Sequence, residues 1–203
     1  MTVSEKQFHL NNFQRALLNV APEYFGIPAI QGQVHMNERA FAYELYHQLR
    51  LIYQNQSWYV NGELRKGLTL LPNYQQGDTL IPDLVIHQHK TTTEDVIAVE
   101  IKSNPYVTGS QIIEDLEKLE IYTRPGDGYL NYHIGILLVI NSNFRYKYSR
   151  MRPENKCRII ELLEFHRIAI WNINNPVIEK DLGCNVILRS DCLDIIRSNT
   201  ITI

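Results

Sequence analysis

The chain has 203 residues, enough for one hydrophobic core, so a single domain is expected. Hydrophobic residues make up 44% and charged residues 21%, which is typical of a globular protein that folds in water. No apolar run approaches the roughly 18 to 20 residues that span a bilayer, and the first residues do not resemble a secretory signal. The net charge of −2 neither favours nor excludes nucleic acid, because binding depends on where the charges lie.

The cysteines argue for a reducing compartment. They are few, odd in number and lack the spacing of a metal knuckle: Cys157, Cys184 and Cys192. Reduced thiols in a cytoplasmic protein explain them better than a disulfide framework or a zinc site.

The first third of the chain predicts two helices. A short one is expected around Phe13, Leu17 and Leu18, followed by a connection over residues 22–28. An amphipathic helix is expected from Asn37, a good N-cap residue, to about residue 54. Its apolar residues recur at spacings of three and four, namely Phe41, Ala42, Leu45, Leu49 and Ile52.

Strands dominate the middle of the chain. Residues 57–71 predict one or two short strands with turns, and residues 81–87 and 96–103 predict two better ones joined as a hairpin. A helix should begin after Thr108, which has capping-box spacing to Gln111, and Pro125 should end it.

The last third continues the alternation. Residues 134–140 form an apolar run that predicts a buried central strand, a helix should follow Pro153, and residues 168–173 predict another strand. No element is predicted beyond Pro176. The order mixes a hairpin with a helical crossover, so the expected fold class is α/β, with one mixed sheet flanked by helices.

Charged residues stand out in the strand at 96–103. Side chains alternate between the faces of a sheet, so Glu100 and Lys102 share one face of an otherwise apolar strand. Buried charges must be paired or bound to something. If the two hairpin strands pair antiparallel, Asp83 lies beside Glu100, and two carboxylates meet one ammonium.

This trio suits phosphodiester hydrolysis. Two adjacent carboxylates repel each other unless a divalent cation lies between them, and hard oxygen ligands favour Mg²⁺ or Mn²⁺. The lysine can position the attacking water or neutralise developing charge. The alternative is a structural contact between Glu100 and Lys102, with Asp83 unrelated.

Pro82-Asp83, followed after residues 84–99 by Glu100-Ile101-Lys102, resembles the signature of the PD-(D/E)xK nuclease superfamily. The resemblance covers residues 37–141 and implies a restriction-endonuclease-like core in the order helix, three strands, helix, strand (αβββαβ). It implies that Asp83 and Glu100 bind the metal, with the Ile101 carbonyl as a further ligand, and that Lys102 assists the attacking water.

Many members of the superfamily also place a glutamate on the first helix, facing the metal. Two candidates, Glu38 and Glu44, differ in helical phase: Glu38 lies within roughly 10 to 20° of the apolar direction and Glu44 more than about 100° away. Glu38 is therefore expected to be the catalytic and metal-facing acid. The alternative for Glu38 is a first-turn acid that complements the helix dipole.

Other charged and polar residues give weaker signals. Glu63 and Lys66 resemble the family only loosely, and an exposed hairpin explains them equally well. Asp115 and Lys118 have a family look, but a solvated helix face with a Glu114–Lys118 pair is the favoured interpretation. The pair His87 and His89 is expected to be exposed at a hairpin tip, without a metal.

The segment 143–152 points independently to nucleic acid. It contains three aromatic residues, no acid, and four cations: Arg145, Lys147, Arg150 and Arg152. Cations follow a phosphate backbone and exposed tyrosines stack on bases, so we predict a binding loop at a sheet edge. A solvated connector whose tyrosines fold back on the domain is the alternative.

Taken together, the sequence predicts one nuclease-like domain over residues 1–203. Its core is 37–141, with an N-terminal extension (1–36) and a C-terminal elaboration (142–203). The predicted activity is Mg²⁺- or Mn²⁺-dependent hydrolysis of nucleic acid, with DNA as the expected partner, no membrane, and a homodimer left open. By family analogy it is an endonuclease of restriction, repair or mobile-element defence. The rivals are an inactive nucleic-acid-binding module and an interaction protein with an internal ion-pair network.

Overall fold

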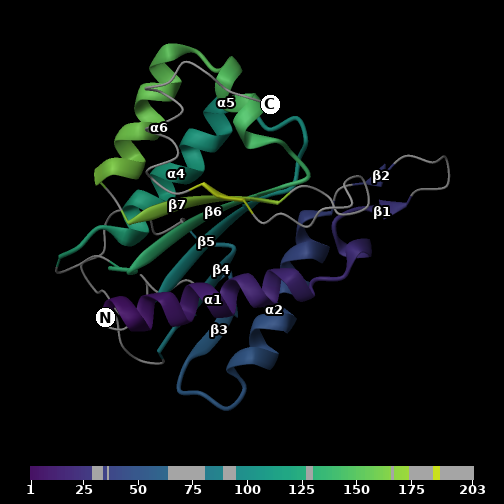
Figure 1. Cartoon of the computed structure of the whole chain (residues 1–203), viewed down its shortest axis with the longest axis vertical. Coiled ribbons are helices and arrows are strands. Elements are labelled where there is room, and N and C mark those ends of the chain that lie inside the picture. The colour runs from purple at the N-terminus through teal and green to yellow at the C-terminus, as the bar shows by residue number, and fades with distance from the viewer. Residues whose placement is uncertain are drawn as a thin grey trace.

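The computed structural model describes residues 1–28, 34–35, 37–63, 81–88, 95–126, 130–165, 167–173 and 185–187. A six-stranded sheet in the order β3-β4-β5-β6-β7-β8 forms the middle layer. Helices α1 and α2 cover one face, and α4, α5 and α6 cover the other (Figure 1). The predicted α/β class, with a mixed sheet between helices, is confirmed.

The helices and strands have clear bounds. The helices are α1 (Val3–Asn19), a 3₁₀ turn η1 (Pro22–Tyr24), α2 (Glu38–Tyr53), α4 (Gly109–Thr123), α5 (Phe144–Arg150) and α6 (Pro153–Phe165). The strands of the main sheet are β3 (Tyr59–Gly62), β4 (Leu84–His87), β5 (Ile97–Lys102), β6 (Ile134–Ile140), β7 (Ile168–Ile173) and β8 (Asn185–Ile187). A separate pair is formed by β1 (Ile27–Pro28) and β2 (Val34–His35).

Helices α1 and α2, from the N-terminal third of the chain, lie on the same face of the sheet. Helix α1 is longer than the sequence predicted, because Thr2 and Glu5 form a capping box that starts it at Val3. Helix α2 begins where predicted, with the Asn37 side chain accepting from the Ala40 N–H at 3.1 Å. The apolar stripe of α2 packs into the same core as Phe13 and Leu17 of α1. The N-terminal extension is therefore part of the core and not an addition to it.

The sheet changes direction at β5. Strands β3, β4 and β5 pair antiparallel, whereas β5, β6 and β7 pair parallel, and β8 returns antiparallel to β7. The hairpin predicted from residues 81–87 and 96–103 is present, with Leu84 opposite Val99. Strand β5 is thus central, and its residues from Ile97 to Ile101 are buried.

Helix α4 is the crossover between β5 and β6. Such a connection between parallel strands returns across one face of the sheet, which places α4 directly over β5 and β6. Gly135 permits the close approach, because a Cβ there would lie 3.1 Å from Thr123 and 3.3 Å from Leu119 of α4.

The C-terminal part differs from expectation in one element. Residues 144–150 form helix α5, not the predicted loop, with Asn143 as its N-cap. Phe144 and Tyr148 of this helix are buried beneath α4 and α6. Strand β7 pairs with β6 in the main sheet, so the C-terminal elaboration completes the central layer. Of the predicted strand region 57–71, the part beyond residue 63 lies outside the described residues.

Within the ranges given above, no helix is both long enough and apolar enough to cross a bilayer.

The contact between α4 and β6 yields a stability prediction. Replacing Gly135→Ala should lower the free energy of unfolding by about 1–3 kcal/mol, because the new methyl group overpacks the space against Thr123 and Leu119. Urea unfolding measures it. The control is Gly62→Ala, whose Cβ would lie at an ordinary 3.5 Å from the Asp83 carbonyl oxygen and should leave stability close to wild type. Equal stability of the two variants would contradict the packing described here.

Candidate active site

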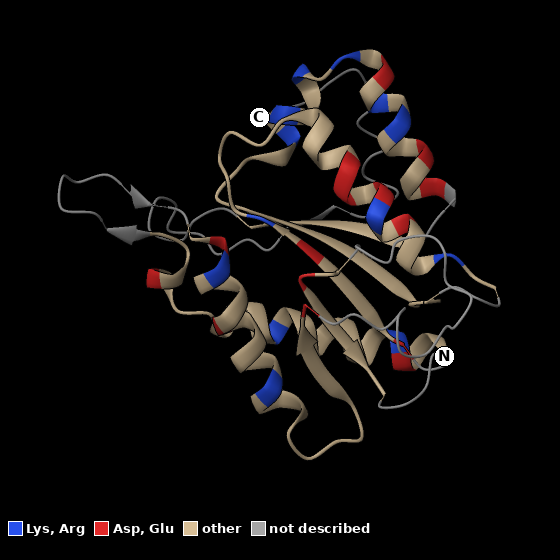
Figure 2. Cartoon of the chain, turned by 180° about the vertical axis from the view of Figure 1, so that it is seen from behind, with Lys and Arg blue, Asp and Glu red and all other residues tan. Residues whose placement is uncertain are grey.

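The charged residues of the described strands lie close together. Among the strands that the structure describes, β5 alone contains Asp, Glu, Lys or Arg, namely Glu100 and Lys102. Figure 2 shows an acidic and a basic position within the central strands, which are otherwise uncharged. Glu100 is only 2% exposed. A carboxylate at such a position is costly unless a partner or a ligand compensates for it.

Asp83 lies beside Glu100, as the hairpin predicted. It is the residue before β4, one step beyond the pair Leu84 and Val99, and that register brings it opposite Glu100. Its Oδ2 accepts a hydrogen bond from the Ile101 backbone N–H at 2.7 Å. The hairpin thus holds the two carboxylates next to each other through backbone pairing.

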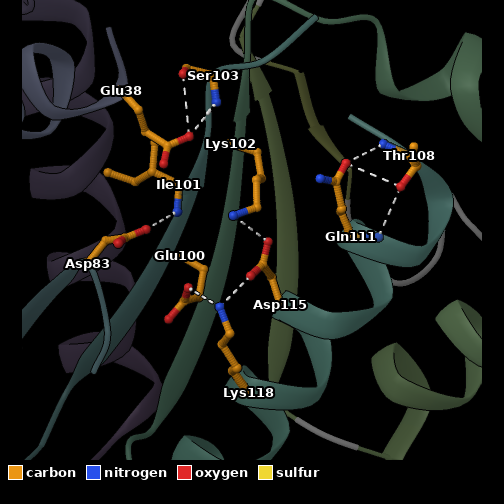
Figure 3. A network of polar contacts seen from close by, with 10 residues as sticks. All are labelled: Glu38, Asp83, Glu100, Ile101, Lys102, Ser103, Thr108, Gln111, Asp115 and Lys118. Carbon is orange, nitrogen blue, oxygen red and sulfur yellow. Dashed lines mark hydrogen bonds and ion pairs between the residues drawn. The ribbon is translucent and has the colours of Figure 1, made fainter. Parts of the chain in front are cut away.

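Three ion pairs lie where α4 packs on β5, two between these elements and one within α4 (Figure 3). The Lys102 ammonium lies 2.9 Å from Asp115, the Lys118 ammonium lies 2.7 Å from Asp115, and Lys118 also lies 3.3 Å from Glu100. Residues two apart on a strand and three apart on a helix each project from one face, so the pairs form side by side. We call Glu100, Lys102, Asp115 and Lys118 the ion-pair cluster.

The prediction for Asp115 and Lys118 was wrong. Asp115 is 2% exposed and does not lie on a solvated face, and Lys118 pairs with Asp115 and Glu100 where a pair with Glu114 was expected. A signal was present in the sequence. Asp115 shares the helical phase of the buried residues Ile112, Leu116 and Leu119. Applying to this helix the phase argument used for Glu38 would have identified Asp115 as a buried acid.

Glu38 reaches the end of β5 from the opposite face of the sheet. Its Oε2 accepts from the Ser103 backbone N–H at 3.0 Å and from the Ser103 hydroxyl at 3.4 Å (Figure 3). Glu38 and Asp83 also line one cavity. Glu44 lies away from this point and accepts a hydrogen bond from Gln48 of its own helix at 2.6 Å. The helical phase therefore separated the two glutamates in the expected sense.

Acids outnumber cations at the end of β5. Four carboxylates, from Glu38, Asp83, Glu100 and Asp115, lie near two ammonium groups, from Lys102 and Lys118. The buried Oε1 of Glu100 has no hydrogen-bond partner among the described residues. This surplus of negative charge and the uncompensated oxygen create a demand for a proton or a cation.

The pKa values of Glu100 and Asp83 are raised, as expected where negative charge is in excess. Burial and the neighbouring Asp83 charge raise the pKa of Glu100 to about 8, although Lys118 opposes them. Burial also raises the pKa of Asp83; the hydrogen bond from the Ile101 N–H lowers it, and the Glu38 charge raises it further.

Both lysines remain ammonium ions. Burial lowers the pKa of each, but the hydrogen bond to Asp115 and the surrounding carboxylates raise it by more, so the net shift is upward for Lys102 and Lys118. Lys102 is therefore suited to donate a hydrogen bond or to neutralise negative charge, and unsuited to accept a proton.

The donor set fits a magnesium or manganese ion. No cluster of three Asp, Glu, His or Cys side chains with metal-binding geometry occurs in the part of the chain that the structure describes. Mg²⁺, however, is commonly held by only one or two carboxylates, with water and substrate phosphate as the other ligands. Asp83 and Glu100 supply two carboxylates, the Ile101 carbonyl is a further oxygen, and the Glu100 Oε1 has no hydrogen-bond partner in the described part of the chain.

The basic segment lies on α5 and the turn after it. Arg145, Arg150 and Arg152 are exposed. Lys147 is not available in the same way, because its ammonium donates to the carbonyls of Pro105 at 2.6 Å and Val107 at 3.2 Å. Burial lowers the pKa of Lys147. Three of the four predicted cations thus face solvent, and the fourth ties α5 to the segment before α4.

The remaining predicted residues lie apart from the ion-pair cluster. Glu63 lines the cavity shared by Glu38 and Asp83, in a left-handed conformation with φ of 49°. His87 is buried, not exposed as expected, and its ring nitrogens contact Asn61 at 2.7 Å and the Gln88 carbonyl at 2.8 Å. Lys66 and His89 lie outside the described residues.

Comparison with known proteins adds no family assignment: no protein-family model matches the chain, and neither a curated protein nor a solved structure is detectably similar to it. The functional argument therefore rests on the site.

The raised pKa of Glu100 predicts how stability varies with pH. The ordinary value of 4.5 applies in the unfolded chain and about 8 in the native protein, so the native state holds a proton that the unfolded state releases. Stability should therefore fall as pH rises from about 5 to about 8.5 in the presence of a chelator. In Glu100→Gln this fall should be much smaller, with a remainder from Asp83, whose pKa is also raised.

Thermal melts across this pH range measure the effect. Glu114→Gln is the matched control, since Glu114 is an exposed acid on α4, and it should keep the wild-type slope. Equal slopes for Glu100→Gln and wild type would mean that Glu100 is ionised in the native protein throughout this range.

Proposed function

We propose that this protein is a metal-dependent nuclease that hydrolyses phosphodiester bonds, with DNA as its substrate. One observation carries the proposal: Asp83 and Glu100 lie side by side, with Lys102 two residues further on, at the end of the one described strand that carries charge. Nothing in the packing of an α/β domain requires buried acids at this point, and their cost is explained if they serve a ligand.

Asp83, Glu100 and the Ile101 carbonyl would hold Mg²⁺ or Mn²⁺. When bound, such an ion lowers the pKa of a coordinated water and stabilises negative charge on a phosphoryl group. The Lys102 ammonium, held 2.9 Å from Asp115, offers its remaining N–H groups to the water or to a phosphate oxygen. Lys118 restrains Glu100 through a 3.3 Å contact, so the carboxylate is oriented before any ligand arrives.

The positions of the elements also support the proposal. Helix α2, strands β3, β4 and β5, helix α4 and strand β6 follow one another in the order that the resemblance to PD-(D/E)xK nucleases implies. Glu38 lies on the first helix of that series, where many members of the superfamily carry a glutamate. A setting in restriction, repair or mobile-element defence follows from family analogy alone.

A second candidate function is nucleic-acid or protein binding without catalysis. The ion-pair cluster favours it, because Lys102 and Glu100 are both engaged with α4 and could serve as an internal network. The unpartnered Glu100 oxygen and the surplus of acids weigh against it, since an internal network would gain from satisfying both.

Cleavage of supercoiled plasmid DNA tests the proposal. With Mg²⁺ or Mn²⁺ the protein should nick or linearise the plasmid, and a chelator should abolish this. Asp83→Asn and Lys102→Gln should each reduce the rate by about 100-fold or more, because they remove groups that act on the reacting phosphate. Metal should also raise the melting temperature of wild type and not that of Asp83→Asn.

Glu38→Gln and Glu44→Gln form the matched pair on α2. The first should cut cleavage by about tenfold or more and the second should leave it near the wild-type rate, since Glu38 lies at the end of β5 whereas Glu44 accepts a hydrogen bond from Gln48 of its own helix. Absence of cleavage by wild type on DNA and RNA with either metal would remove the nuclease and favour the binding module.

Nucleic-acid binding should depend on α5 in a salt-sensitive way. Replacing Arg145, Arg150 and Arg152 together by alanine should weaken binding and flatten its salt dependence, by about 0.9 log units for each lost contact with duplex DNA. Lys147→Ala should leave the slope unchanged, because that ammonium is already bound to two carbonyls.

Arg158→Ala is the control for net charge, since Arg158 is paired with Glu117 and Glu161 on the outer helices. A salt slope that falls equally in the triple variant and in Arg158→Ala would rule out α5 as the phosphate contact.

A further inference from the structure

A cavity of about 470 Å³ opens beside the candidate active site, between α2 and β3. Its volume lies within the range of small-ligand pockets. It is lined by Glu38, Arg39, Ala42, Tyr43, Tyr46, Asn61, Gly62, Glu63 and Asp83. Two of these residues, Glu38 and Asp83, also belong to the site at the end of β5, so the cavity continues directly from the place where the reacting phosphate would lie.

Tyr43 offers an open aromatic face in this cavity. Its side chain is 66% exposed although α2 has a well-formed apolar stripe elsewhere. Tyr46, one turn further, is already occupied: the Arg50 guanidinium lies 5.9 Å from its ring centroid and donates to its hydroxyl at 3.3 Å. Tyr43 is therefore the ring that can stack on a ligand, and Tyr46 forms a wall.

The charges of the cavity select the ligand. Among the described residues that line the cavity, the three acids Glu38, Glu63 and Asp83 outnumber the one cation, Arg39. An anion such as phosphate would be repelled from the interior, whereas a flat neutral group with N–H donors would find carboxylate acceptors and an aromatic surface. Arg39 is exposed and precedes Tyr43 by one helical turn, so it can meet a phosphate outside the cavity.

We propose that this cavity binds an unpaired nucleobase of the substrate, stacked on Tyr43, while the adjoining phosphodiester lies at Asp83 and Glu100. The inference rests on the proposed nuclease function and adds to it a substrate class: nucleic acid with a single-stranded segment at the cleavage point. A base within a duplex keeps its edge and both faces occupied, so it cannot stack on Tyr43 in this cavity without leaving the duplex.

The experiment removes the base from the substrate and the aromatic ring from Tyr43, separately and together. Cleavage of a single-stranded oligonucleotide is first mapped, and the base next to the cleaved bond is then removed to leave an abasic nucleotide. Affinities are measured with Mg²⁺ in the Lys102→Gln background, which holds the substrate uncleaved. Removing the base and replacing Tyr43→Ala should each weaken binding by roughly 5- to 100-fold. The two changes together should weaken binding no more than either alone, because they break the same contact.

Tyr43→Phe is the matched variant and should keep wild-type affinity, since it retains the ring. Tyr106→Ala is the positional control: Tyr106 is 84% exposed and does not line the cavity, so it should show no dependence on the missing base. Additive effects of the abasic nucleotide and Tyr43→Ala, or equal loss in Tyr43→Phe, would overturn the base pocket.

The failure of this inference is distinct from failure of the nuclease. Metal-dependent cleavage with no role for Tyr43 overturns the pocket alone. If wild type does not cleave, binding of the intact single strand that is lost in Tyr43→Ala and kept in Tyr43→Phe supports the pocket and overturns the hydrolase. A duplex with one unpaired base at the cleavage point is the last arm: binding that equals the single strand shows capture of an extruded base, and binding no tighter than to a fully paired duplex restricts the ligand to single strands.

Discussion

Asp115 is the residue on which the geometry of the site depends. Its carboxylate lies between two ammonium groups, 2.9 Å from Lys102 and 2.7 Å from Lys118, and is almost completely shielded from water. Without it the two lysines would repel each other, and the crossover helix α4 would lose its ion pair with Lys102 and keep the one between Lys118 and Glu100. Because one acid holds both lysines, it determines the positions of Lys102 and of Glu100, which Lys118 contacts.

The cluster also explains how a buried strand can tolerate charge. Glu100 and Lys102 lie on β5 beside β6 and beneath α4, so solvent cannot compensate for Glu100 and reaches Lys102 only in part. Partial pairing within the protein satisfies the lysines and leaves the acids in excess. Such a site can fold, and its excess of negative charge still makes the binding of a cation or a proton favourable.

We propose different roles for the residues on the two sides of the site. On the α4 side, ion pairs orient the acid and the lysine that would face the reacting phosphate. On the α2 side, Glu38 is bound to Ser103 at the end of β5, and the same helix carries Tyr43 along the cavity wall. Helix α2 would then contribute to both the chemistry, through Glu38, and the recognition of a base, through Tyr43, whereas α4 would contribute to the chemistry through the ion pairs.

The sequence by itself determined the features that depend on neighbours along the chain. Two apolar strands joined by a short polar connection predict an antiparallel hairpin, and that pairing placed Asp83 beside Glu100; helical phase placed Glu38 toward the sheet and Glu44 away from it. The tertiary structure alone decided what depends on packing between distant elements. Asp115 and Lys118 looked like a solvated helix face because pairing within a helix is visible in sequence, whereas the docking of α4 over β5 is not. Likewise Lys147 looked like its basic neighbours until folding brought the carbonyls of Pro105 and Val107 to its ammonium.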